Sequence, residues 1–201
     1  MAYSSWLTPD KLSGNGNDTV NVSANSSNTG RNPRSTNITF SAANCEDVVR
    51  TVMQAGKPET TTMQATAAAT QQGGTVTISG TSNSSKLTFS LGTGDLSLTL
   101  PTKYTAAGVQ TNNGAAIAGD VGATQEFAFS IAFSVGENTS TSSKSRQVVV
   151  TDNGGHTATC TLTQAAGAAY LTVSAVSGDL PWDASTSVSF TVESNTNWTI
   201  S

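Results

Sequence analysis

An internal repeat constrains the fold of this chain more than any other feature of its sequence. Residues 34–40 align with residues 144–150, and residues 50–55 align without a gap with residues 160–165, at one constant offset of 110 positions. In both copies apolar and polar residues alternate, a turn follows, and the alternation resumes before a shared Gln-Ala end. The turn at residues 152–155 contains Asn-Gly-Gly, which accepts the positive φ angles of tight hairpins. The repeat therefore predicts two β-hairpins, each closing a domain.

A second repeat concerns the N-terminal half of these domains, which we call the front; the half that ends with the hairpin is the back. Three alternating segments near the C-terminus share their outline with three earlier segments, at offsets of about 95 to 102 positions. The later segments are residues 170–174, 187–192 and 195–200, and the earlier ones are residues 75–78, 86–91 and 95–98. Front halves are thus expected to begin near Thr75 and Tyr170.

These two repeats predict the domain organisation. Residues 75–166 form a complete sandwich, whereas residues 1–56 supply a back half without a front and residues 167–201 supply a front half without a back. Residues 57–74, rich in Thr, Ala and Gln, are predicted to be a linker in coil conformation. A Gly-, Ala- and Asn-rich stretch at residues 104–125 is predicted to be a long insertion loop, either a contact element or mobile filler.

The composition indicates an all-β protein and excludes several functions. Charged residues make up 11% of the 201 positions, and 18 are Gly. The net charge of −4 and nine scattered Lys and Arg residues argue against a nucleic-acid partner. No apolar run is long enough to span a membrane, and residues 1–10 lack the features of a signal peptide, so we expect no membrane contact and synthesis into the cytoplasm.

Metal and nucleophile chemistry have few candidate residues in this chain. His156 is its one histidine, and the two cysteines, Cys45 and Cys160, have neither CxxC-type nor Cys/His neighbours. The repeat places Cys45 on a turn and Cys160 on a strand, so no shared disulfide is implied. We therefore expect no metal, no cofactor and no catalytic residues, and we predict that the protein is not an enzyme.

Several segments resemble the BACON family of immunoglobulin-like β-sandwiches. Residues 171–174 and 188–200, in which a strand leads through Ser-Asn-Thr to Trp198, look like the opening of that domain. Residues 5–9, 14–20, 28–31 and 52–56 look like its remainder. The middle copy departs from the family because it has Leu96 or Leu98 near the Trp position. The resemblance implies two BACON-like sandwiches, one of them assembled from the N- and C-terminal parts of the chain.

This resemblance implies a non-catalytic module for spacing, adhesion or sugar contact. Because related domains decorate phage particles and no secretion signal is visible, the leading hypothesis is a structural virion protein assembled in the host cytoplasm. It would be an auxiliary or decoration protein on a phage capsid, with the major capsid protein or other virion proteins as partners. The alternative is a carbohydrate-binding or adhesive module for host or mucin glycans. A polymer made by strand exchange is a third possibility.

The split domain can be completed in two ways. Either residues 167–201 close on residues 1–56 within one chain, which the high effective concentration favours, or they complete a neighbouring subunit by strand exchange. Exchange would mean self-association. The side chains expected to pair between the halves are Val188, Phe190, Val192, Trp198, Ile200 and Trp6.

Three residues are candidate glycan or partner contacts. Trp182 and Asp183 lie between predicted strands, where an exposed indole stacks on a sugar ring and a carboxylate accepts sugar hydroxyls. Tyr104 opens the predicted insertion. For Trp6 and Trp198 a core or boundary position is favoured over sugar stacking, because each follows a polar turn and begins an alternating strand.

Overall fold

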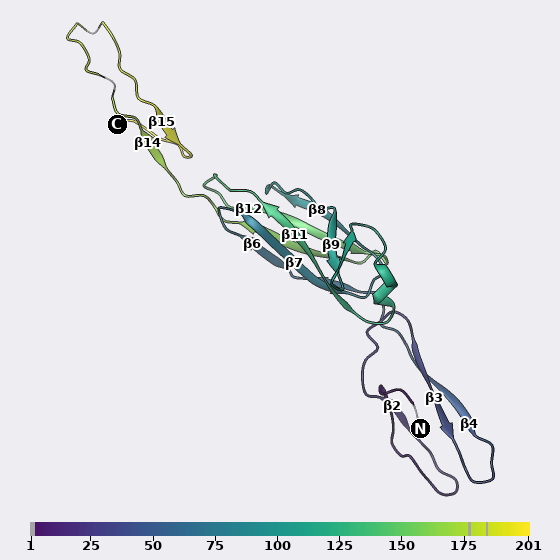
Figure 1. The fold of residues 1–201 in the computed structure, drawn as a ribbon. Helices are drawn as coiled ribbons and strands as arrows, with labels where there is room; N and C mark the ends of the chain where they lie inside the picture. The colour runs from purple at the N-terminus through teal and green to yellow at the C-terminus, as the bar shows by residue number, and fades with distance from the viewer. Residues whose placement is uncertain (1–2, 177, 184) are drawn as a thin grey trace.

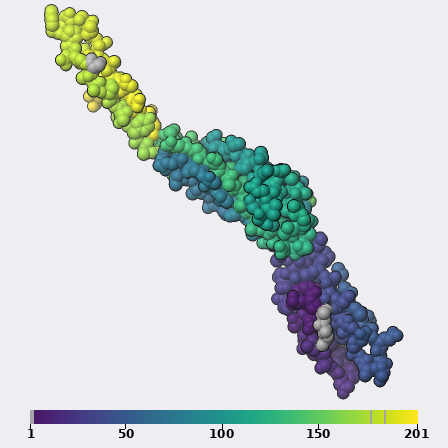
Figure 2. Space-filling model, in the orientation of Figure 1, coloured from purple at the N-terminus to yellow at the C-terminus, as the bar shows by residue number. Residues whose placement is uncertain are grey.

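A computed structural model describes residues 3–176, 178–183 and 185–201 of the chain. Three units follow one another in a row (Figures 1 and 2). They are an N-terminal unit (residues 3–56), a middle sandwich (residues 57–167) and a C-terminal unit (residues 168–201). No helix in the described residues is long and apolar enough to cross a membrane. The predicted all-β, immunoglobulin-like class is confirmed.

The middle sandwich consists of two facing sheets. The five-stranded sheet has the order β10-β9-β11-β7-β5, with β5 Thr61–Met63, β7 Gly74–Ser82, β9 Lys103–Ala106, β10 Val109–Asn112 and β11 Phe127–Val135. The four-stranded sheet has the order β6-β13-β12-β8, with β6 Thr66–Ala69, β8 Leu87–Gly94, β12 Lys144–Asp152 and β13 Thr157–Gln164. All these pairs are antiparallel except β13 with β6.

Strict alternation builds the core between these sheets. In β11 every second side chain, from Phe127 to Val135, is buried. Val148 and Val150 of β12 face them from the other sheet and are 0% exposed. Side chains two positions apart extend from the same face of a sheet. A strand with this alternation therefore buries one row of side chains in the core and turns the other row outward. The middle sandwich therefore has its own closed core.

The two terminal units are smaller and consist of hairpins. In the N-terminal unit β1 Leu7–Pro9 pairs with β2 Val22–Ala24, and β3 Arg34–Phe40 pairs with β4 Val48–Gln54. In the C-terminal unit β14 Leu171–Val173 pairs with β15 Val192–Ser194. All three pairs are antiparallel.

The hairpin repeat is present at the predicted offset. The β3–β4 register runs from Arg34 opposite Gln54, and the β12–β13 register runs from Lys144 opposite Gln164, so both members of the pair are shifted by 110 positions. Further equivalent pairs follow along both ladders. Residues 34–54 and 144–164 are thus two copies of one hairpin.

The predicted linker is wrong for most of its length. Residues 57–74 contain β5 and β6, which pair with β7 and with β13 in the middle sandwich. Ala67 and Ala69 of β6 pack against the core. Small side chains fit where a strand lies close to its neighbour, so this segment is ordered by its contacts despite low hydrophobicity. The front of the middle sandwich therefore begins near residue 57, and its expected start at Thr75 is wrong.

The predicted insertion loop at residues 104–125 is also largely structured. It contains most of β9, all of β10 and a 3-10 helix, η1 Ala118–Ala123. The β9–β10 hairpin extends the five-stranded sheet. Helix η1 lies beside the N-terminal unit, because its Gly122 and Ala123 carbonyls accept hydrogen bonds of 3.0 and 2.8 Å from the amides of Arg31 and Asn32. The stretch therefore forms a junction between two units.

The terminal units do not close on each other within one chain. They lie at opposite ends of the middle sandwich (Figure 1). The chain enters this sandwich beside η1 and leaves it at the far end of β13. Because the middle sandwich acts as a spacer, a high effective concentration does not bring the ends together. Pairing of the two halves between subunits stays a prediction.

Candidate functional site

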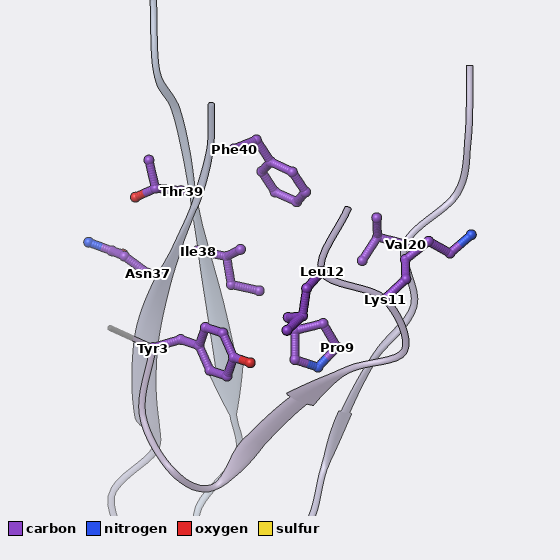
Figure 3. Close-up of a pocket in the computed structure, with 9 residues that line it drawn as sticks. All are labelled: Tyr3, Pro9, Lys11, Leu12, Val20, Asn37, Ile38, Thr39 and Phe40. Atoms are coloured by element: carbon purple, nitrogen blue, oxygen red, sulfur yellow. The ribbon is translucent and has the colours of Figure 1, made fainter. Parts of the chain in front are cut away.

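The N-terminal unit has an apolar groove between its two hairpins (Figure 3). The residues that line it are Tyr3, Pro9, Lys11, Leu12, Val20, Asn37, Ile38, Thr39 and Phe40. Figure 3 shows Tyr3, Leu12 and Phe40 directed into the space between β3 and the segment that follows β1. Side chains of both hairpins therefore form the groove.

Alternation in β3 explains the groove's floor. Ile38 and Phe40 extend from the same face of the strand, two positions apart. Their equivalents at the 110-position offset, Val148 and Val150, are both 0% exposed, whereas Phe40 is 44% exposed. The same hairpin face that is closed in the middle sandwich is thus open in the N-terminal unit.

The inner end of this unit is closed and fixed. Trp6 and Leu7 are buried, and the guanidinium carbon of Arg34 lies 4.8 Å from the Trp6 ring centroid. Arg34 Nε also donates to Gln54 Oε1 at 2.7 Å. A cation over an indole face is attracted by the ring quadrupole, so this contact ties the β1–β2 hairpin to the β3–β4 hairpin.

The rim of the groove is polar but internally paired. Lys11 Nζ lies 2.9 Å from Asp18 Oδ1, and this hydrogen bond lowers the pKa of Asp18 from its ordinary value. The Asn21 side chain donates to Asp10 Oδ2 at 2.8 Å and lowers the pKa of Asp10. Lys11, which lines the groove, already has a carboxylate partner in Asp18, so it does not offer an unpaired cation to an anionic ligand. The site suits an apolar occupant.

Two sheet edges are open beside the groove. Within the described ranges 3–176, 178–183 and 185–201, β3 and β4 pair only with each other. In the middle sandwich the equivalent strand β12 also pairs with β8, and β13 also pairs with β6. Unpaired backbone donors and acceptors along an edge are a template for another strand.

The predicted pairing residues fall in two separate places. Trp6 is buried at the inner end of the N-terminal unit, which agrees with a core position. The others, Val188, Phe190, Val192, Trp198 and Ile200, lie in the C-terminal unit at the far end of the molecule. Val188 and Val192 are partly buried there, and the remaining three are exposed.

The three predicted contact residues are placed differently. Trp182 is 98% exposed, and Asp183 beside it is also exposed. A hydrogen bond from Ser185 lowers the pKa of Asp183. Tyr104, in contrast, is 2% exposed and lies 5.0 Å from the Phe89 ring in the core of the middle sandwich. Its predicted contact role is wrong, because β9 joins the sheet and turns this ring inward.

Sequence reasoning missed the groove residues Tyr3, Leu12 and Phe40 as a site. The signal that would have found them is the hairpin repeat combined with Phe40. Phe40 stands where the closed copy has Val150, so a larger ring occupies the open face at this position.

One family model matches the N-terminal unit of the chain. Residues 1–55 match the BACON family, described as "Putative binding domain, N-terminal". The predicted BACON resemblance is thereby confirmed for this unit. None of the curated proteins matches the chain.

Two solved structures show a weak likeness. The zebrafish RET cadherin-like domains 1 to 4 are 14% identical with a TM-score of 0.34, over 69% of this chain and 35% of that one. An endo-fucoidan hydrolase from glycoside hydrolase family 107 is 14% identical with a TM-score of 0.32, over 84% of this chain and 23% of that one. The chain thus spans about a third and about a quarter of these structures.

Proposed function

We propose that this protein is a non-enzymatic structural protein that binds a polypeptide segment in the groove of its N-terminal unit. One observation carries the proposal: the apolar face of the β3–β4 hairpin is open in this unit, although the same face is closed in the middle sandwich. Apolar surface left in water favours association with a partner that covers it.

Strand addition is the mode of binding that this geometry supports. The free edges of β3 and β4 offer backbone hydrogen bonds, and the groove offers places for alternating side chains beside Ile38 and Phe40. In strand addition the backbone supplies affinity and the side-chain sites supply specificity. Because the rim is internally paired through Lys11 and Asp18, the expected segment is apolar and extended.

Photo-crosslinking from the groove tests this function. A photoreactive phenylalanine analogue at position 40 of the full chain should form adducts with a polypeptide after irradiation. The same analogue at position 49 is the matched control, because Val49 pairs with Thr39 on the other face of the hairpin, is 48% exposed and does not line the groove. Adducts at position 40 that are absent at position 49 are the expected result. No adduct, or equal yields at both positions, would refute the proposal.

The setting that we propose for this function is a phage particle, with the chain as an auxiliary capsid protein bound to the major capsid protein. The support for this setting is the sequence argument alone. Mass spectrometry of purified particles from the source tests it. The chain should be present at a fixed ratio to the major capsid protein, and its absence from the particles would refute the setting.

Carbohydrate binding is the second candidate, favoured by the exposure of Trp182. An indole ring that is 98% exposed, with a carboxylate at Asp183, presents the stacking face and the hydrogen-bond acceptor that a sugar uses. Glycan-array binding by the full chain that is lost in Trp182→Ala would support this function. Binding that is equal in both proteins, or absent from both, would refute it for this residue.

A further inference from the structure

The C-terminal unit repeats the beginning of the middle sandwich. Its strand β14 stands 110 positions after β5, and Asn195 stands 112 positions after Asn83. Three hydrogen bonds at the start of the middle sandwich recur there with nearly equal lengths. Thr60 N donates to Asn83 Oδ1 at 2.8 Å, and its counterpart Tyr170 N donates to Asn195 Oδ1 at 3.0 Å. Ser82 Oγ donates to Thr60 O at 3.1 Å, and Ser194 Oγ donates to Tyr170 O at 2.9 Å. Gln64 N donates to Ser79 O at 3.0 Å, and Ser174 N donates to Thr191 O at 2.9 Å. The C-terminal unit is thus the front of a sandwich, and the expected equivalence of Tyr170 with Thr75 is wrong.

The N-terminal unit repeats the end of the same sandwich. Beyond the hairpin itself, the turn before β3 matches the turn before β12, around Asn28 and Asn138. Asn28 Nδ2 donates to the carbonyls of Asn32 and Ala55 at 2.8 and 3.2 Å. Asn138 Nδ2 donates to the carbonyls of Ser142 and Ala165 at 2.9 Å each, and all three residues are shifted by 110 positions. This unit is therefore the back of a sandwich.

The middle sandwich shows how a front and a back fit together. Its front strands β6, β7 and β8 pair with its back strands β13, β11 and β12, respectively. Two of these pairings, β6 with β13 and β8 with β12, have no counterpart at β4 and β3 in the described residues of the N-terminal unit. At the offsets of 110 and 112 positions the C-terminal unit carries the equivalents of β5, β6 and β7, whereas β8 corresponds to positions 199–206, of which the 201-residue chain includes only 199–201. The C-terminal unit can therefore supply a partner for the edge of β4 and a cover for the open face, but not the strand that pairs with β3.

The exposed apolar side chains of the two units agree with this fit. Phe190 is 56% exposed, and its equivalent at the 112-position offset, Ile78, is 0% exposed in the middle core. On the other side, Phe40 is exposed while its equivalent Val150 is buried. Each unit leaves open the face that the other would cover, and both faces carry aromatic rings.

We infer that the C-terminal unit of one copy completes the N-terminal unit of a second copy, in the arrangement of the middle sandwich. This inference rests on the proposed function and names the occupant of the groove. The two units of one copy lie at opposite ends of its middle sandwich, so the occupant comes from another copy (Figure 1). A contact that joins two different surfaces repeats from copy to copy and gives a closed ring or an open head-to-tail chain.

An engineered disulfide tests this register. In the middle sandwich Thr161 lies opposite Thr66 in the parallel pair β13–β6. The equivalent positions at the 110-position offset are Thr51 and Val176. The full chain carrying Thr51→Cys and Val176→Cys in a Cys45→Ser background is oxidised and run on a non-reducing gel, and each single variant in that background is the control.

The expected result is a ladder of covalent trimers and larger species in the double variant, whereas the single variants stop at the dimer. An intrachain disulfide, or monomers with free thiols, would overturn the inference. The photoreactive analogue at position 40 distinguishes failure of this inference from failure of the proposed function. If no ladder forms but position 40 crosslinks to a different polypeptide, the named occupant is wrong and the proposed function holds; if neither product forms, both fail.

Discussion

Truncation of Val148 tests whether the middle sandwich has a closed core of its own while the N-terminal unit is open. Val148 is 0% exposed, and Val148→Ala removes two buried carbon atoms. At about 0.8 kcal/mol for each, with a further contribution from the cavity, the loss of stability is about 2–3 kcal/mol. A domain of this size shifts its Tm by roughly 4 °C per kcal/mol. We therefore expect the main transition, which is the thermal unfolding of the middle sandwich, to fall by about 8–12 °C.

The matched control is Val52→Ala, the same truncation on the core-facing side of the equivalent hairpin. Val52 is only partly buried, and its face is open, so no closed cavity forms. We expect about 0.8 kcal/mol or less, confined to the N-terminal unit, with the main transition unmoved. Differential scanning calorimetry of the full chain measures both. If the two variants lower the main transition equally, or Val148→Ala leaves it in place, the division into a closed and an open unit is refuted.

Three further predictions concern the junction and the thiols. A Cβ at Gly30 would lie 2.6 Å from a backbone oxygen of η1, so Gly30→Ala should speed hydrogen exchange of the amides that the N-terminal unit donates to η1; unchanged exchange would contradict this close contact. The hydrogen bond from Lys57 lowers the pKa of Glu126 below its ordinary 4.5, so this pair stabilises the junction above that pH and is lost as the pH falls through the lowered value. The protection of these amides, corrected for the intrinsic exchange rate, should then fall in acid in the wild-type chain and stay unchanged in a Glu126→Gln control, and an equal response in both proteins would contradict it. Burial raises the pKa of Cys160 while Cys45 is exposed, so a thiol reagent should modify one cysteine per native chain and two after unfolding, and rapid modification of both in the native chain would contradict the packing.

The hairpin repeat could be predicted from the sequence because its signal is local and periodic. Ile38 and Val148 stand at the same point of an apolar-polar alternation, and this alternation alone fixes which face of each hairpin is apolar. The constant offset between the copies also fixes their equivalence. The register found in both hairpins is the one that this offset implies.

The linker and the insertion could not be predicted in the same way, because neighbouring strands impose their structure. Ala67 and Ala69 have low β-propensity, but β6 lies along β13, which supplies hydrogen bonds and a core to pack against. Tyr104 looks like a loop residue in a Gly- and Asn-rich stretch, and pairing of β9 with β11 is what turns it inward. Such long-range pairing leaves no periodic signal in a short segment.

The site was only partly visible in the sequence for a geometric reason. Alternation around Phe40 and Phe190 shows that both need a facing sheet, but it does not show where the chain carries each of them. The entropic argument for closure within one chain assumes a flexible connection, whereas the structured middle sandwich separates the units. Burial and topology together were needed to show that the groove is open.

The solution mass of the full chain over about a hundredfold range of concentration tests the central claim most directly. If the C-terminal unit of one copy completes the N-terminal unit of the next, the mass should rise above 20.4 kDa with concentration. Deletion of residues 170–201 should abolish this rise. A constant mass of 20.4 kDa across the whole range would contradict the account.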